Sequence, residues 1–176
     1  MKLWVKSVLA LLLVFNLTAC CSREEGPDSQ GKIADYSRSL VNHPQDAETY
    51  LKRGLLYIQT GDFGRAIADF NRALMIDPKF AEAYSCRGFA FLGKGYYHRA
   101  LIDANRALEF NPKDAQAHFC KAQLLDQTGN KKEALAAYQS FLKYSAAQPQ
   151  VNITIAKARI QALNKGPGYW TSASNH

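Results

Sequence analysis

The chain has 176 residues, of which 47% are hydrophobic, and this length favours a single domain with a core of ordinary size. The composition excludes a disordered or fibrous chain. The formal charge of +7 is modest, and no run of five or more like charges occurs, so the sequence gives little support to a nucleic-acid partner.

Residues 1–19 have the three parts of a secretory signal peptide. Lys2 and Lys6 form a basic start, an apolar run covers residues 8–15, and Leu17-Thr18-Ala19 leads to Cys20. The run is shorter than the roughly 20 residues that cross a bilayer, and no later segment approaches that length. Removal of residues 1–19 takes away two lysines and leaves 20 basic against 15 acidic residues, which is a mature charge of about +5.

The segment Leu17-Thr18-Ala19-Cys20 resembles the lipobox of bacterial lipoproteins. The resemblance implies that Cys20 is diacylated, becomes the mature N-terminus and anchors the chain in the cell envelope. Cys21 at the next position fits the periplasmic face of the outer membrane under the enteric sorting rule, and a host with a single membrane is the alternative. Two acyl chains give stable anchoring, whereas one gives only marginal binding. The alternative is a secreted protein in which Cys20 is incidental.

Residues 20–32 are predicted to be the lipidated cysteine and a flexible tether. Residues 22–32 carry no apolar side chain and cannot offset the entropy of packing. These eleven residues reach about 36 Å at full stretch, so we expect the folded part, residues 33–165, to stay near the membrane. Residues 166–176 are predicted to be a loose tail.

A helix is expected over residues 33–44, because Ile33, Tyr36 and Leu40 fall at helical spacing before Pro44. Three units of 34 residues then follow without insertion, over 47–80, 81–114 and 115–148. The string Arg65-Ala66-Ile67-Ala68-Asp69-Phe70-Asn71-Arg72-Ala73-Leu74 returns as Arg99-Ala100-Leu101-Ile102-Asp103-Ala104-Asn105-Arg106-Ala107-Leu108, and Arg53-Gly54 returns as Arg87-Gly88.

The period and these residues resemble the tetratricopeptide repeat (TPR). Its small, aromatic and proline positions are matched in the first unit by Tyr50, Gly54, Tyr57, Ala66, Phe70, Ala73 and Pro78, and in the second by Tyr84, Gly88, Phe91, Ala100, Ala107 and Pro112. The third unit keeps Gly129, Ala134 and Tyr138 but has Ala122, Phe141 and Ala146 at other pattern positions. The resemblance implies an all-α TPR solenoid of about three repeats.

Helices are predicted near residues 46–60, 63–76, 80–93, 97–110, 114–128 and 131–144, with no strand. Gly61, Gly95 and Gly129 supply the turn inside each hairpin, and Pro78 and Pro112 end the second helices. Pro44 lies one period before Pro78, which makes the helix over 33–44 an N-terminal half-repeat. The stripe of Ile153, Ala156, Ile160 and Leu163 predicts a C-terminal capping helix over 150–165.

No motif for catalysis or for a cofactor is found, so we predict that the chain is not an enzyme and binds no metal or cofactor. His118 and Cys120 stand two apart on a helix and point about 200° apart, so they cannot easily share an ion. Cys86 and Cys120 are expected to be thiols, because neighbouring helix axes lie about 8 to 10 Å apart and a disulfide needs Cα atoms within about 7 Å.

The repeated arginines Arg65, Arg72, Arg99 and Arg106 fall on the second helices, which line the convex wall of TPR proteins. A solvated basic stripe is the simpler interpretation, and attraction to anionic lipid is the alternative.

In TPR proteins, ligands lie against the first helices, and that mapping gives a candidate groove here. Its apolar floor and polar rim comprise Glu48, Leu51, Lys52, Leu55, Ile58, Glu82, Cys86, Phe89, Leu92, Gln116, Phe119, Gln123 and Asp126. The lysine, arginine and asparagine that grip a carboxylate in the chaperone-tail clamp are missing from the matching positions. An amphipathic helix or an extended apolar peptide suits this floor, and the chain's own terminal helices are the alternative occupant.

The sequence therefore predicts a membrane-anchored scaffold that binds a protein or peptide in the bacterial cell envelope. A pilotin for a secretin or type IV pilus system is the alternative, and a cell-wall enzyme is a third. No nucleic-acid partner is expected.

Overall fold

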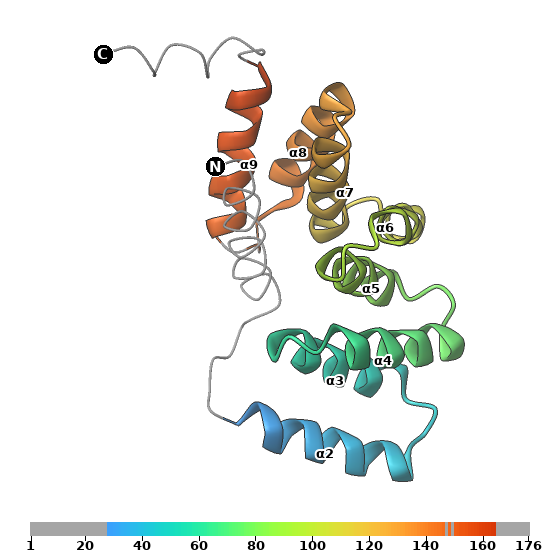
Figure 1. Cartoon of the computed structure of the whole chain (residues 1–176). Coiled ribbons are helices and arrows are strands. Elements are labelled where there is room, and N and C mark those ends of the chain that lie inside the picture. Colours follow the sequence, from blue (N-terminus) through green and yellow to red (C-terminus); the bar gives the residue numbers. More distant parts are fainter. Residues whose placement is uncertain (1–27, 147, 149, 165–176) are drawn as a thin grey trace.

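The computed structural model of the protein describes residues 28–146, 148 and 150–164. The predicted signal peptide, Cys20, most of the predicted tether and the predicted tail lie outside these residues. The described part is all helical: every element in it is an α-helix, as Figure 1 shows. The helices are α2 Ser29–Asn42, α3 Ala47–Gln59, α4 Phe63–Ile76, α5 Ala81–Gly93, α6 Tyr97–Phe110, α7 Ala115–Gln127, α8 Lys131–Tyr144 and α9 Gln150–Asn164.

The three helical hairpins begin and end within one residue of the sequence prediction. The half-repeat helix and the capping helix are also present, as α2 and α9. Helix α2 begins four residues before residue 33, so part of the predicted tether lies in its first turn, where Lys32 N donates to the Asp28 carbonyl at 3.0 Å. Polar composition did not predict this turn, because extending a helix adds one hydrogen bond per residue without needing buried apolar surface.

Glycine closes each hairpin at the same position of the repeat. Gly61, Gly95 and Gly129 have φ values of 77°, 76° and 82°, a left-handed conformation that only glycine adopts without strain. The residue after each glycine donates its N–H back into the first helix, as in the 2.8 Å bond from Asp62 N to the Tyr57 carbonyl. This turn sends the second helix back along the first.

The helices within the first two hairpins approach closely at a second glycine, Gly54 or Gly88. A Cβ atom on Gly54 would come within 2.5 Å of the Phe70 ring, and one on Gly88 would meet the Ala100 carbonyl oxygen at 3.2 Å. The second unit has Ala104 where the first has Phe70, so its helices meet backbone to backbone. Backbone atoms of α6 thus occupy, beside Gly88, the place that the Phe70 ring takes beside Gly54.

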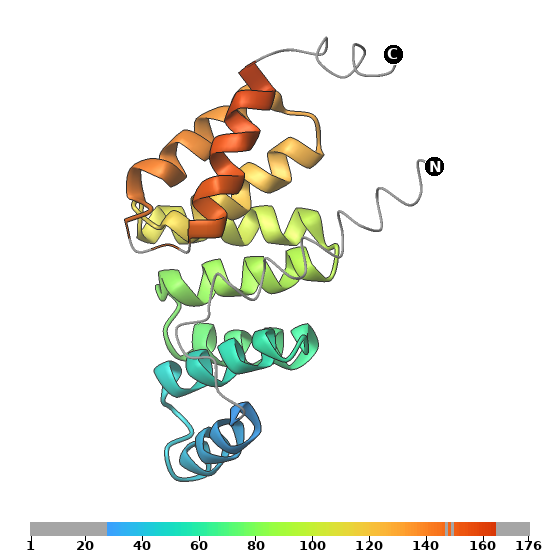
Figure 2. The same cartoon turned by 90° about the vertical axis from the view of Figure 1, so that its left-hand side faces the viewer.

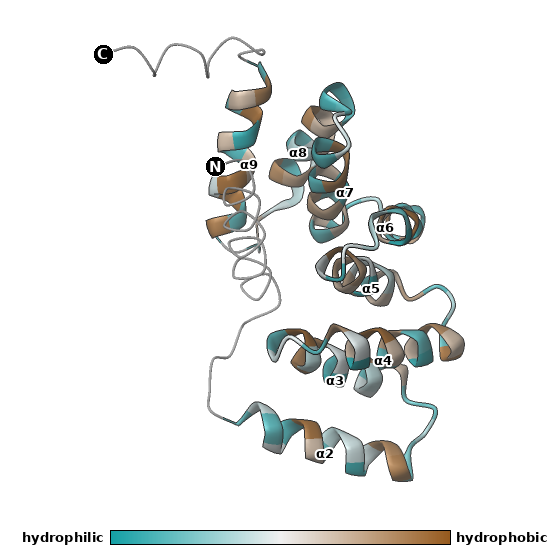
Figure 3. Ribbon diagram, viewed as in Figure 1, coloured by the Kyte–Doolittle hydropathy of each residue, from teal (hydrophilic) through white to brown (hydrophobic). Residues whose placement is uncertain are grey.

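The stack curves so that α3, α5 and α7 form its inner wall. These helices contact one another from one repeat to the next, and α9 packs on α8 at the C-terminal end. Hydrophobic and hydrophilic residues share every helix (Figure 3), as expected for helices that bury one face. None of the helices within the described residues has the length and apolarity to cross a bilayer.

Candidate partner-binding face

The predicted groove residues all lie on the inner helices, but they differ in accessibility. Glu48, Lys52 and Glu82 are exposed, and Leu55, Gln116 and Asp126 are half-buried. The other seven are buried: Leu51, Ile58, Cys86, Phe89, Leu92, Phe119 and Gln123. The accessible part of this face is therefore mainly polar, which differs from the apolar floor that the sequence suggests.

The apolar residues are buried because neighbouring units close over them. Leu51, Ile58 and Phe89 belong to one core cluster that extends across the first two repeats. Phe119 points into its own hairpin, with its ring centroid 4.8 Å from that of Phe141 and 6.2 Å from that of Tyr138. Leu92 packs in a third cluster that links the second and third repeats. These side chains hold the solenoid together.

The Asp126 carboxylate is bound by an arginine of the capping helix α9. Arg159 of α9 donates to both of its carboxylate oxygens, Nε to Oδ2 at 2.6 Å and Nη2 to Oδ1 at 2.7 Å. The Tyr138 hydroxyl is 3.3 Å from the same Oδ2, and burial together with the Asp126 carboxylate raises the pKa of Tyr138. The Asp126 side chain is 11% exposed, so it closes the end of the stack and offers little to a partner.

The exposed part of the inner wall is acidic. Glu48 pairs with Lys52 at 3.4 Å, and Glu82 occupies the same repeat position on α5. Although the Glu82 side chain is accessible, the helices around it displace part of its water; this partial desolvation raises the pKa of Glu82, and the charges of Glu48 and Asp114 raise it further. Because like charges gather here with one lysine among them, a basic segment would relieve their repulsion.

An arginine on the first helix of each of the first two repeats ties three helices together. Arg53 donates to Asp69 through Nε at 2.8 Å and Nη2 at 2.7 Å, and its Nη1 donates to Ser37 Oγ at 2.9 Å. Asp69 lies on α4 and Ser37 on α2. The paired guanidinium and carboxylate planes form the strong bidentate geometry.

The same contacts recur one period later. Arg87 donates to Asp103 at 2.7 Å and 2.8 Å and to Asn71 Oδ1 at 2.7 Å. We call each set of three an arginine bolt. The sequence showed these residues recurring but not their pairing, and the signal that could have revealed it is the constant spacing of 16 residues from Ser37 or Asn71 to the arginine and from the arginine to the aspartate.

Local contacts engage several of the predicted outer arginines. Arg65 donates to Asp62 and its guanidinium carbon lies 4.6 Å from the Tyr57 ring centroid. Arg99 lies over Phe91 and Tyr96, and Arg106 pairs with Glu109 at 2.7 Å. The stripe exists on α4 and α6, with part of its charge already balanced.

The described residues hold no cluster of three or more His, Cys, Asp or Glu side chains that could bind a metal ion. His118 stacks on Tyr144 with ring centroids 5.6 Å apart, and its Nε2 donates to the Pro112 carbonyl at 3.0 Å. His118 therefore has a structural role at the aromatic position of the repeat. Cys86 and Cys120 are buried and are not joined in a disulfide.

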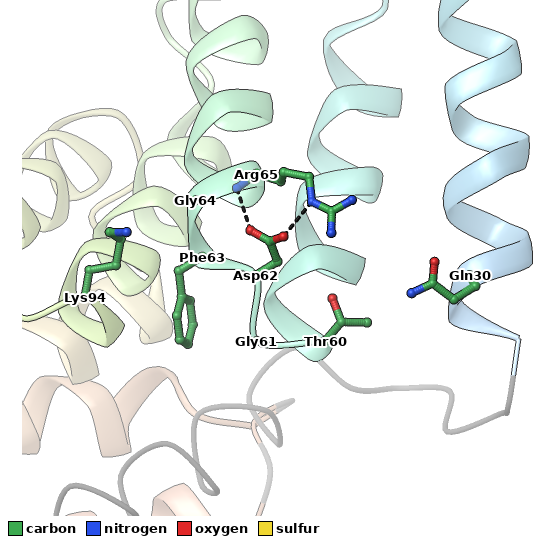
Figure 4. A pocket seen from close by; sticks show the side chains of 8 residues that line it. All are labelled: Gln30, Thr60, Gly61, Asp62, Phe63, Gly64, Arg65 and Lys94. Carbon is green, nitrogen blue, oxygen red and sulfur yellow. Dashed lines mark hydrogen bonds and ion pairs between the residues drawn. The ribbon is translucent and has the colours of Figure 1, made fainter.

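A hollow of about 550 Å³ lies outside the predicted groove, at the turn between α3 and α4. Gln30 of α2 and Lys94 beyond α5 share its lining with the turn itself, as Figure 4 shows. Its other lining residues are Thr60, Gly61, Asp62, Phe63, Gly64 and Arg65. The start of α2 thus lies beside the hairpin turns.

The fold defined by these helices is a TPR solenoid, and comparisons with known proteins agree. Residues 54–95 match the TPR repeat family, and residues 104–136 match a tetratricopeptide repeat family. A search of curated proteins gives no match.

Solved structures similar to this chain include MamA and two proteins described as TPR proteins or domains. A crystal structure of MamA has 26% sequence identity and a TM-score of 0.69, and the match covers 80% of each chain. YrrB, whose structure is described as a TPR protein with an unusual peptide-binding site, has 22% identity, a TM-score of 0.65 and coverage of 74% of this chain and 66% of its own. The TPR domain of Arabidopsis OM64 has 20% identity and a TM-score of 0.61, and the match covers 68% of this chain and 95% of that domain.

Proposed function

We propose that this protein is a lipid-anchored scaffold of the bacterial cell envelope whose inner wall binds a basic segment of a protein partner. The observation that carries the proposal is the charged surface of α3 and α5, where Glu48 and Glu82 are exposed and the pKa of Glu82 is raised. TPR repeats generally serve as scaffolds, and the peptide-binding site described for YrrB supports a peptide-binding function here.

The partner-binding part can be tested by photo-crosslinking in the native host. A crosslinking amino acid at Gln116, on the inner wall, should capture a protein that the same group at Asn105, exposed on α6, does not. Glu82→Lys should reduce that product at least several-fold, because it reverses the charge at the centre of the acidic surface. Glu109→Lys makes the same charge change on the outer wall and should leave the product intact.

A crosslink at Gln116 that survives Glu82→Lys would reject the basic partner, and equal products from Gln116 and Asn105 would reject the inner wall as the site.

The anchor is tested separately. The proposed acylation of Cys20, on the periplasmic face of the outer membrane, predicts that fatty-acid labelling is lost in Cys20→Ala and that a high-salt wash releases the variant, but not the wild-type chain, from the membrane fraction. Labelling that persists in this variant would refute the anchor without touching the groove.

A further inference from the structure

The two long edges of the helix stack are built from different segments. The turns within the hairpins, residues 60–65, 94–99 and 128–133, form what we call the hairpin-turn edge. The links between hairpins, residues 43–46, 77–80 and 111–114, form the connection edge. Figure 2 shows the turns on one side of the stack and the links on the other. Each edge can therefore face a different environment.

Charge separates the two edges. The hairpin-turn edge has five basic and two acidic side chains: Arg65, Lys94, Arg99, Lys131 and Lys132 against Asp62 and Glu133. The connection edge has two basic and three acidic side chains: Lys79 and Lys113 against Asp46, Asp77 and Asp114. The first edge is thus net positive and the second slightly negative, so an anionic surface would attract one edge and not the other.

Exposed tyrosines stand among the cations of the hairpin-turn edge. Tyr96 and Tyr97 are 48% and 49% exposed. The Lys94 Nζ lies 5.8 Å from the Tyr96 ring centroid, and the Arg99 guanidinium carbon lies 5.7 Å from it. Tyrosine rings flanked by lysine and arginine suit the headgroup layer of a bilayer, because each side chain has an apolar body and a polar tip.

The chain enters the folded part at this same edge. Gln30, in the first turn of α2, lines one hollow with the α3–α4 turn and Lys94 (Figure 4). Asp28 precedes it, and only eight residue steps separate Asp28 from Cys20, which can span at most about 28 Å. An anchor at Cys20 would hold the hairpin-turn edge nearer to the membrane than the connection edge.

We propose that the hairpin-turn edge docks on the anionic headgroups of the membrane that carries the chain. The orientation relies on the proposed acyl anchor, whereas the attraction between the edge and the lipid does not. Docking fixes how the solenoid stands on the bilayer and turns the connection edge away from it. Each basic residue near an anionic membrane strengthens binding about five-fold. At about 0.1 M salt, this attraction is largely screened at distances beyond about 10 Å.

The orientation is measured on the lipidated full chain in vesicles. A fluorophore is attached at Asn130→Cys on the hairpin-turn edge or at Gln45→Cys on the connection edge, both exposed and neutral. Vesicles contain phosphatidylcholine alone or with an equal part of phosphatidylglycerol, and lipids with a headgroup nitroxide quench nearby dyes. We expect phosphatidylglycerol to increase quenching at Asn130→Cys strongly and to change it little at Gln45→Cys.

A matched pair of charge reversals tests the cause. Lys131→Glu/Lys132→Glu should abolish the effect of phosphatidylglycerol, and it preserves α8 because acidic residues favour the first turn of a helix. Lys79→Glu/Lys113→Glu makes the same charge change on the connection edge and should leave the effect in place. Equal quenching at both edges, or equal loss in both reversals, would overturn the proposal.

The unacylated chain separates docking from the anchor. Cys20→Ala should still sediment with vesicles containing phosphatidylglycerol at low salt, and adding Lys131→Glu/Lys132→Glu should weaken this at least ten-fold. If the wild-type chain were found not to be acylated while this vesicle binding remained, only the proposed anchor would be rejected. If the unacylated chain showed no salt-sensitive binding to these vesicles, the docking proposal would be overturned. If a crosslinker at residue 130 captured a protein and no lipid in cells, the hairpin-turn edge would instead bind a protein partner.

Discussion

Arg87 shows how one side chain can join two repeats. Its guanidinium pairs with Asp103 inside its own repeat and with Asn71 in the preceding one. The Arg87 and Asp103 side chains are 19% and 4% exposed, so the pair is shielded from most of the solvent. Loss of one partner would leave a buried charge, which is more costly than loss of both.

Asp103→Ala should therefore lower the free energy of unfolding by about 3 kcal/mol in urea titrations. The double variant Arg87→Met/Asp103→Ala should cost less than that single change. Glu109→Ala, which removes the exposed partner of Arg106, should cost less than about 1 kcal/mol. The single variant Arg87→Met completes the cycle. If the free-energy losses of Arg87→Met and Asp103→Ala simply added in the double variant, the two side chains would have no coupling energy.

Glu82 gives stability a pH dependence of known sign. Its folded-state pKa is raised above 4.5 by partial desolvation and by neighbouring acids, so ionisation opposes folding, and the penalty is absent well below 4.5 and complete above the folded pKa. Glu82→Gln should raise the urea midpoint at about pH 7 and have no effect at about pH 4.

Asp46 serves as a control with the opposite sign. Hydrogen bonds from the Thr49 hydroxyl and backbone N–H lower its pKa below 3.8, so its stabilisation is present above 3.8 and is lost as pH falls through the lower folded value. Asp46→Asn should destabilise at about pH 7 and progressively less in acid. A gain from Glu82→Gln that persisted in acid would rule out ionisation as its cause.

At the scale of elements, the sequence predicts most of this structure. Glycine, proline and the 34-residue period set the helix ends, because turn chemistry is local and repeats three times. The accessibility of the inner wall could not be predicted, because it depends on curvature: Leu51 and Phe89 are buried only where successive repeats close on one another. The partners of Arg53 and Arg87 were not identified from the sequence, because the recurring 16-residue spacing marks the candidates whereas side-chain direction decides which neighbouring helix each arginine reaches.

Helix α9 is held at one end of the stack by a mixed contact. Its apolar side packs against the third repeat, where Ala156 and Phe141 share a cluster, and Arg159 reaches past α8 to Asp126 on α7. The apolar packing that the stripe of Ile153, Ala156, Ile160 and Leu163 predicts is thus accompanied by an ion pair that the stripe did not indicate.

Arg159→Ala should increase hydrogen exchange several-fold over residues 150–164 while leaving α3 and α4 unchanged. The apolar contacts keep α9 docked, so local opening is expected rather than global unfolding. Lys157→Ala, an exposed change on the same helix, controls for the effect of an added alanine on helix propensity. Equal exchange in both variants would mean that the pair with Asp126 contributes nothing to docking.

At the scale of the whole molecule, the repeats are not equally joined. The first two units have arginine bolts, but the third has Lys121 and Ala137 at the positions of Arg87 and Asp103. Asn105 occupies the position of Asn71, so the acceptor on the preceding repeat is in place. The junction between the second and third repeats relies on apolar packing in the core cluster that includes Leu92 and Leu124.

Lys121→Arg/Ala137→Asp should build a third bolt and stabilise the chain relative to the two single variants. Ala137 is buried, so Ala137→Asp alone should destabilise by burying an unpaired carboxylate. A double-mutant cycle should give a coupling of about 1 to 3 kcal/mol. A coupling near zero would show that the third junction has a different geometry from the first two.

The equal 16-residue steps on both sides of each bolting arginine restrict how such a chain can change in length. A one-residue insertion inside a hairpin would shift the aspartate out of register with its arginine, and one between hairpins would displace the Ser37 or Asn71 acceptor. Duplication or loss of a complete 34-residue unit would preserve every spacing. The chain can therefore gain or lose whole repeats without breaking a bolt, whereas a small insertion between the outer residues of a bolt, Ser37 and Asp69 or Asn71 and Asp103, would break it.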